Sequence, residues 1–168
     1  MTHARIRTTA VRALIGAGVM VAATATPASA AVDYQAIQLV NSTLCIQVPG
    51  NSTADRIQLA TASCGTTASQ GWTFTVDSSG SWGELRNKLT GKCMDIRAAS
   101  KDYDGVVQQY TCSGRDNQKF RFENTGNVLI RNKNSNMCVS AFDNAKPVAL
   151  TQWGCPINYP YEVWQLIP

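Results

Sequence analysis

The sequence predicts an all-β domain made of three copies of one unit of four short strands. Strings that begin with cysteine recur at steps of 48 and 45 residues, starting at Cys45, Cys93 and Cys138. An aromatic residue follows each string at steps of 48 and 44 residues: Trp72, Phe120 and Trp164. Apolar residues alternate over short runs, and no stretch keeps a helical period over three turns. A repeat of this length is typical of stacked or arrayed units.

Residues 1–30 are expected to form a secretory signal peptide rather than part of the fold. Three arginines precede an apolar stretch at 13–24, and Ala28-Ser29-Ala30 fits a small-residue cleavage site. The apolar stretch is shorter than the roughly 20 residues that a spanning helix needs. We therefore expect a secreted, extracellular protein with no membrane contact after cleavage, and a single domain at 31–168.

The charge of the chain excludes several functions once the signal is removed. The chain has 15 Lys and Arg, of which three lie before residue 31, and 11 Asp and Glu, which all lie after residue 30. The net charge falls to about +1 (12 minus 11), and the basic residues are scattered, so no nucleic-acid partner is expected. The one histidine, His3, leaves with the signal, which excludes Ser-His and Cys-His catalytic pairs. No metal and no cofactor are expected.

The three repeats are expected at about 35–78, 83–124 and 127–168. An aliphatic residue lies eight positions before the first cysteine of each repeat: Ile37, Leu85 and Ile130. Turn sequences such as Thr90-Gly91 and Asp104-Gly105 divide the short runs. Three four-stranded units fit either a propeller or a closed barrel with pseudo-threefold symmetry. The barrel is favoured, because propellers have four blades or more.

All six cysteines lie after residue 30, and an even number in a secreted chain predicts three disulfides. If the repeats share one local fold, each closes its own bridge: Cys45–Cys64, Cys93–Cys112 and Cys138–Cys155. Each bridge would contribute roughly 3 kcal/mol by restricting the unfolded chain. Zinc binding is the competing interpretation, and it is disfavoured because the chain has no Cys-x-x-Cys.

Taken together, these residues resemble the ricin B-chain-type β-trefoil lectins, which include bacterial xylan- and galactan-binding modules. The hallmark of that family is Cys-x-Asp followed by Gln-x-Trp in each of three repeats. Gln70-Gly71-Trp72 matches fully, Gln118-Lys119-Phe120 conservatively and Glu162-Val163-Trp164 loosely. The resemblance spans about 37–168 and implies a β-trefoil. The aromatic residue of each motif follows a polar turn, and we expect all three to meet in the core.

The resemblance also implies where a sugar binds. The family uses the Asp of Cys-x-Asp, a Gln and an aromatic before the second cysteine, and the Asn-Gln that opens Gln-x-Trp. The middle repeat matches at every position: Asp95, Gln108, Tyr110, Asn117 and Gln118. The first repeat matches only at Gln70, and its other residues are Gln47, Ala60, Ala62 and Ser69. The third matches only at Trp153, beside Ser140, Thr151, Tyr161 and Glu162. One working site is implied.

The chemistry of these side chains suits a sugar. The flat ring of Tyr110 would cover the apolar face of a pyranose. Asp95 offers strong, charge-assisted acceptors to hydroxyls, and Asn117 both donates and accepts. Gln118 either bonds the sugar or holds Asp95 in place. We expect weak binding of a galactose- or xylose-type carbohydrate in a shallow, wet site.

Two other functions remain open from the sequence. The two degenerate repeats favour a protein-binding trefoil, such as a protease inhibitor or a subunit of a secreted complex. A glycosidase needs two carboxylates that face each other across the sugar. Asp95 with Asp102 or Asp104 is the one candidate cluster, so the protein is not expected to be an enzyme.

Overall fold

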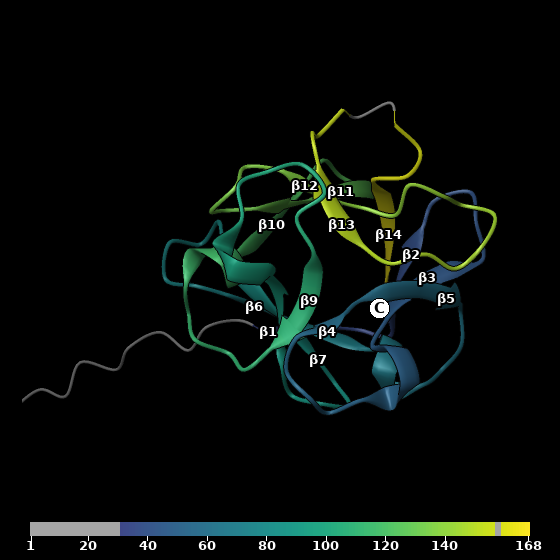
Figure 1. Cartoon of the computed structure of the whole chain (residues 1–168), viewed down its shortest axis with the longest axis horizontal. Helices are drawn as coiled ribbons and strands as arrows, with labels where there is room; N and C mark the ends of the chain where they lie inside the picture. Colours follow the sequence, from purple (N-terminus) through teal and green to yellow (C-terminus); the bar gives the residue numbers. More distant parts are fainter. Residues whose placement is uncertain (1–30, 157–158) are drawn as a thin grey trace, which may run out of the picture.

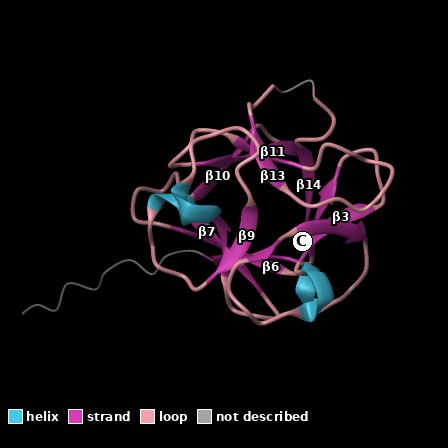
Figure 2. Ribbon diagram, in the orientation of Figure 1, coloured by secondary structure: helices cyan, strands magenta, loops and turns pink. Residues whose placement is uncertain are grey.

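The computed structural model describes residues 31–156 and 159–168. The predicted signal peptide, at 1–30, lies outside the described residues. The described part of the chain folds into strands and four short 3-10 helices, with no α-helix. None of its helices is long and apolar enough to cross a membrane. Figures 1 and 2 show three lobes of strands and loops arranged around a common centre.

Each lobe is one repeat. The first contains β2 (Ala36–Leu39), β3 (Leu44–Gln47), β4 (Ile57–Gln58), β5 (Ala60–Ser63) and β6 (Trp72–Val76). The second contains β7 (Gly83–Asn87), β8 (Cys93–Ile96), β9 (Val107–Tyr110) and β10 (Phe120–Glu123). The third contains β11 (Asn127–Asn132), β12 (Cys138–Ser140), β13 (Thr151–Trp153) and β14 (Val163–Ile167). The expected four strands per repeat are confirmed, with the third strand of the first repeat divided into β4 and β5.

Short 3-10 helices occupy matching places in the repeats. The helices η1 (Pro49–Asn51) and η3 (Arg97–Ala99) follow the second strand of their repeats. The helices η2 (Ala68–Gln70) and η4 (Asp116–Gln118) lie just before the last strand. The polar residues that open the Gln-x-Trp motifs therefore lie on tight turns.

The barrel strands pair antiparallel in the order β6, β7, β10, β11, β14 and β2. The hydrogen-bonded sheet does not continue as a closed ring from β2 to β6. Instead β6 pairs with β1 (Ala31–Tyr34), which is separated from β2 by Gln35 alone. The backbone N–H of Gln35 donates to the carbonyl of Ile167 at 2.7 Å. The chain thus passes between the two ends of the barrel sheet through a bend at Gln35.

A ring of backbone hydrogen bonds marks the pseudo-threefold axis. The N–H of Leu59 donates to Val107 O at 2.9 Å, and the N–H of Val107 donates to Leu150 O at 3.2 Å. The N–H of Leu150 completes the ring to Leu59 O at 2.8 Å. All three side chains are fully buried. One residue from each repeat therefore joins the three lobes at the centre.

The predicted core residues are confirmed. Trp72, Phe120 and Trp164 are fully buried, as are the three aliphatic residues that precede the cysteines: Ile37, Leu85 and Ile130. Each buried indole N–H has a partner, because Trp72 donates to Ile46 O and Trp164 to Val139 O. Burial of these large rings supplies much of the driving force for folding.

The three predicted disulfides are confirmed as Cys45–Cys64, Cys93–Cys112 and Cys138–Cys155. Each bridge links residues of the same repeat, so the local pairing inferred from the repeat is correct. The bridge of the middle repeat joins β8 to the residues that follow β9. Those two strands carry Asp95, Gln108 and Tyr110, so the bridge restrains the predicted site.

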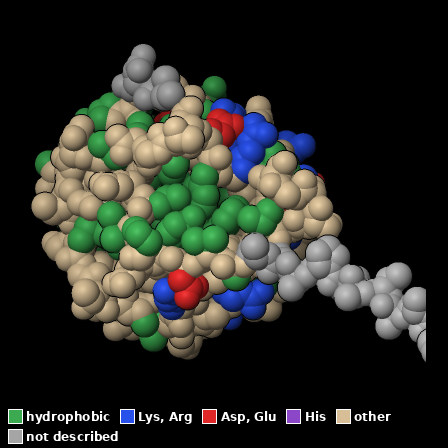
Figure 3. Space-filling model, turned by 180° about the vertical axis from the view of Figure 1, so that it is seen from behind, with side chains coloured by type: hydrophobic (Ala, Val, Ile, Leu, Met, Phe, Trp, Pro, Cys, Tyr) green, Lys and Arg blue, Asp and Glu red, His purple; other side chains and the backbone are tan. Residues whose placement is uncertain are grey.

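Three aromatic rings from different strands meet at the barrel. Phe122 on β10 contacts Tyr34 on β1, with ring centroids 5.8 Å apart, and Phe74 on β6, at 4.7 Å. The strand β1, which precedes the first expected repeat, is thus part of the packing. Hydrophobic side chains also gather at the centre of the face opposite to that of Figure 1, as Figure 3 shows.

Candidate functional site

A pocket of about 710 Å³ lies on the middle repeat and contains all five predicted site residues. Asp95 comes from β8, and Gln108 and Tyr110 come from β9. Asn117 and Gln118 come from η4. The strands β8 and β9 pair so that Asp95 faces Gln108 across the ladder. The fold therefore brings together residues that are up to 23 positions apart in the chain.

The carboxylate of Asp95 is at the centre of the site. Its Oδ1 accepts a hydrogen bond from Gln108 Nε2 at 2.8 Å. Its Oδ2 accepts from Asn117 Nδ2 at 2.8 Å and from Gln118 Nε2 at 2.9 Å. A carboxylate has about four lone-pair positions, so three are used within the chain and about one is left on Oδ1. Asp95 can still accept a hydrogen bond from a ligand hydroxyl.

Asp95 is only 4% exposed. Burial raises the pKa of its carboxyl above the usual value, and the hydrogen bonds from Gln108, Gln118 and Asn117 oppose that shift. No cation pairs with Asp95 among the described residues. Three amide donors therefore hold a buried carboxylate ready to accept one more hydrogen bond.

Gln118 is committed to the fold. Its Oε1 accepts from the N–H of Ser113 at 2.7 Å and from the Ser113 hydroxyl at 3.0 Å. Its Nε2 donates to Asp95 and to Thr111 O, the latter at 3.1 Å. All four of its hydrogen-bonding positions are occupied. Of the two roles that the sequence leaves open for Gln118, the geometry favours holding Asp95 in place.

Asn117 keeps one polar atom available. Both hydrogens of its Nδ2 are used, on Asp95 and on Ile96 O at 2.9 Å. Its Oδ1 accepts no hydrogen bond from the described residues. The turn itself is held by Asn132, whose Nδ2 donates to Asn117 O at 3.1 Å and to Lys119 O at 3.2 Å. The side-chain oxygen of Asn117 is thus a fixed acceptor inside the pocket.

Three arginines that the sequence reasoning missed also line the pocket: Arg56, Arg97 and Arg115. Arg97 donates through Nε to Gln108 Oε1 at 2.7 Å. Arg97 lies two positions after Asp95, and Arg115 lies two positions before Asn117. This closeness in sequence to predicted site residues could have indicated both arginines. Arg56 belongs to the first repeat and reaches the pocket because β4 pairs with β9. No local pattern indicates that contact.

The first repeat keeps the turn but not the site. Gln70 donates to Ser63 O at 2.9 Å and accepts from the N–H of Gly65 at 2.7 Å, as Gln118 does with its own neighbours. The position of Asp95 is taken by Gln47, which lies 3.4 Å from Gln70 Nε2. Alanines stand where Gln108 and Tyr110 lie in the middle repeat, so two polar or aromatic contacts are missing.

The third repeat buries polar groups that have no partner among the described residues. Ser140, Thr151 and Glu162 take the positions of Asp95, Gln108 and Gln118, and their side-chain oxygens form no hydrogen bond within that part of the chain. Burial raises the pKa of Glu162 to about 7. Trp153 takes the position of Tyr110 and packs against two exposed rings, with ring centroids 4.4 Å apart for Tyr103 and 5.2 Å apart for Phe142.

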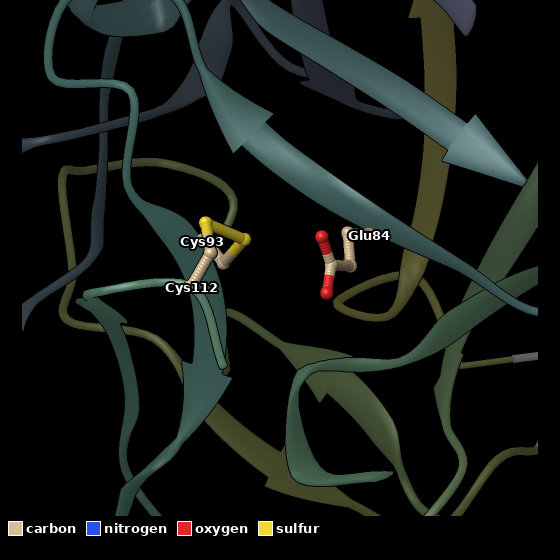
Figure 4. A group of neighbouring side chains, drawn as sticks. All are labelled: Glu84, Cys93 and Cys112. Atoms are coloured by element: carbon tan, nitrogen blue, oxygen red, sulfur yellow. A yellow bond between two sulfur atoms is a disulfide. The ribbon is translucent and has the colours of Figure 1, made fainter. Parts of the chain in front are cut away.

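One group of side chains superficially resembles a metal site. Glu84, Cys93 and Cys112 lie together, as Figure 4 shows. The two sulfur atoms form a disulfide, so neither is a thiolate that can coordinate a metal. Glu84 itself forms ion pairs with Arg86 and Lys119, each at 3.5 Å. This cluster is therefore better explained as a structural contact.

Comparison with known proteins agrees with the fold. Among solved structures, the designed threefold-symmetric protein ThreeFoil is similar with a TM-score of 0.75 and 22% identity, over 81% of this chain and 98% of that one. An exo-β-1,3-galactanase from Clostridium thermocellum is similar with a TM-score of 0.73 and 23% identity, over 80% of this chain and 30% of that one. The Polyporus squamosus lectin bound to Neu5Acα2-6Galβ1-4GlcNAc is similar with a TM-score of 0.68 and 17% identity, over 80% of this chain and 48% of that one.

This chain spans under half the length of the galactanase and of the fungal lectin, so the likeness concerns one domain of each. No curated protein matches the chain. The family model described as the ricin-type β-trefoil lectin domain matches residues 33–164, nearly all of the described part. The chain therefore belongs to the ricin-type β-trefoil lectin family.

Proposed function

We propose that the protein acts outside the cell and binds a galactose- or xylose-type carbohydrate through the pocket of the middle repeat. The observation that carries this proposal is the orientation of Asp95 by three amide side chains, with one acceptor position left open. The predicted signal peptide supports the extracellular location. Lectin neighbours support carbohydrate binding in general.

The polar atoms that remain available match a sugar edge. Asp95 Oδ1 and Asn117 Oδ1 accept hydrogen bonds from two neighbouring hydroxyls. The half-buried ring of Tyr110 forms part of the pocket wall and covers the apolar face of the pyranose. Gln108 and Gln118 orient Asp95. Galactose is the first sugar to test, because the names of two structural neighbours include galactose or galactan.

Binding without catalysis fits the charges in the pocket. Among the residues that line it, Asp95 is the one carboxylate, and hydrolysis of a glycosidic bond needs two. Asp102 and Asp104, the other candidates from the sequence, do not line the pocket. We therefore propose a lectin-like protein with no enzymatic activity.

A second candidate function rests on the third repeat. Tyr103, from the loop before β9 of the middle repeat, is 59% exposed and Phe142 is 38% exposed, and both rings contact Trp153 of the third repeat, which lacks the sugar-binding set. Exposed aromatic side chains are enriched at protein interfaces. This cluster supports a protein partner in the secreted fraction, which Trp153→Ala would release in a pull-down from culture medium.

A glycan array followed by calorimetry on the best ligand tests the main proposal. Wild type should bind a galactose- or xylose-containing glycan, and Tyr110→Ala should abolish that binding at millimolar ligand. The matched control is Trp153→Ala, which removes the corresponding aromatic residue of the third repeat and should leave binding unchanged. Failure of the wild type to bind any glycan or plant polysaccharide at millimolar concentration would refute the proposal.

A further inference from the structure

The cations of the protein divide into two groups. The described part contains twelve Lys and Arg, and eight of them form ion pairs within 4.0 Å. The four without an ion pair in that part of the chain are Arg56, Arg97, Lys101 and Arg115. Three of these four line the pocket of the middle repeat. Unpaired positive charge is thus concentrated at one place.

The three arginines approach the pocket from different segments. Arg97 lies in η3, where its Nε donates to Gln108 and its Nη2 donates to Arg56 O at 3.0 Å. Arg115 directly precedes η4. Arg56 is held beside β9 by a hydrogen bond from its backbone N–H to Gln109 O at 3.0 Å. The backbones of all three are fixed, while the guanidinium groups of Arg56 and Arg115 form no hydrogen bond with the described residues.

The pocket has no matching negative charge of its own. Asp95 is its one acidic residue, and it is bonded to amides rather than to arginines. The acidic residues next to Arg56 and Arg115 are engaged elsewhere, Asp55 with Lys92 at 2.6 Å and Asp116 with Lys133 at 2.9 Å. Three guanidinium groups against one carboxylate leave an excess of positive charge in a concave site, which attracts anions.

We propose that the preferred ligand is an acidic sugar, one whose ring carries a carboxylate or a sulfate. This inference rests on the proposed function of the pocket as a sugar site. The hydroxyls of the sugar face Asp95 and Asn117, and its anionic group lies at the arginines, away from the Asp95 carboxylate. The planar fork of arginine matches carboxylate and sulfate oxygens and gives strong, charge-assisted hydrogen bonds.

Calorimetry with matched pairs of sugars tests the inference. The pairs are galactose against galacturonate, galactose against galactose 6-sulfate, and xylotriose with and without a glucuronic acid branch. We expect an acidic member to bind at least about ten times more tightly than its neutral partner, a difference of about 1.4 kcal/mol. That advantage should shrink between about 0.02 and 0.3 M salt, because exposed charges are screened.

Variants assign the effect to the arginines. Arg56→Gln and Arg115→Gln should each lower the ratio of acidic to neutral affinity several-fold. The matched control is Lys101→Gln, which removes the unpaired cation outside the pocket and should leave the ratio unchanged. Acidic sugars that bind no more tightly than their neutral partners overturn the inference and leave the proposed function intact. If neither kind binds, the sugar site itself is refuted and the inference with it.

Discussion

Gln70 and Gln118 occupy the same position in the first two repeats and form the same backbone hydrogen bonds. Each accepts at 2.7 Å from the N–H five residues before it, and each donates to the carbonyl seven residues before it. They differ in the third contact. Nε2 of Gln118 donates to the Asp95 carboxylate at 2.9 Å, whereas Nε2 of Gln70 donates to Oε1 of Gln47 at 3.4 Å. The glutamine therefore belongs to the fold, and the aspartate decides whether a site forms beside it.

The first prediction follows from that comparison. Gln118→Met and Gln70→Met should each destabilise the protein by about 1–3 kcal/mol, because a backbone N–H at a tight turn loses its acceptor. Urea unfolding measures this loss. Only Gln118→Met should also weaken sugar binding, since only Gln118 orients a carboxylate. Equal loss of binding in the two variants would contradict this division of roles.

Asp95→Asn should abolish binding and also destabilise the fold. The NH2 group that replaces one carboxylate oxygen is a donor. In the place of Oδ1 it faces the donor of Gln108, and in the place of Oδ2 it faces the donors of Asn117 and Gln118. We expect a loss of about 1–3 kcal/mol in unfolding free energy and no binding in calorimetry. Gln47→Ala is the control at the matching position of the first repeat. It should bind like the wild type.

Glu162 should make stability depend on pH. Its pKa is about 7 in the folded protein against 4.5 as the ordinary value, so the folded state holds this proton more tightly than the unfolded state. The protein should therefore lose stability as the pH rises from 4.5 to about 7, by about 3 kcal/mol. Chemical unfolding at about pH 4 and pH 8 measures the loss.

Glu162→Gln is the control for that pH effect. It removes the titrating group and restores the glutamine found in the other two repeats. The variant should exceed the wild type in stability at pH 8 and match it more closely at pH 4. A variant with the same pH dependence as the wild type would assign the effect to other groups.

Each disulfide should contribute about 3 kcal/mol, since the bridges span 17 or 19 positions. The double variants Cys45→Ser/Cys64→Ser and Cys93→Ser/Cys112→Ser should therefore lower the unfolding free energy to a similar extent. Sugar binding should separate the two variants, because only the second bridge ties β8 of the pocket to the residues that follow β9. Binding that survives equally well in both variants would show that β8 and β9 hold the site without it.

The sequence predicts what is repeated or local in the chain. The core aromatics Trp72, Phe120 and Trp164 recur at a nearly constant period, and each disulfide joins positions of one repeat. Both features could therefore be predicted from the sequence. The five predicted site residues also share one repeat. The position of Arg56 in the pocket could not be predicted, because it depends on the pairing of β4 with β9, two strands of different repeats. The bend at Gln35 likewise results from how the two ends of the sheet meet.

The ring formed by Leu59, Val107 and Leu150 has a consequence for how the protein folds. Its members lie 48, 43 and 91 positions apart, so no two neighbouring repeats can complete it without the third. A fragment lacking one repeat would leave a buried donor and a buried acceptor unpaired at the axis. We therefore expect the three lobes to unfold as a single cooperative unit, because the central ring closes only when Leu59 and Leu150, 91 positions apart, come together.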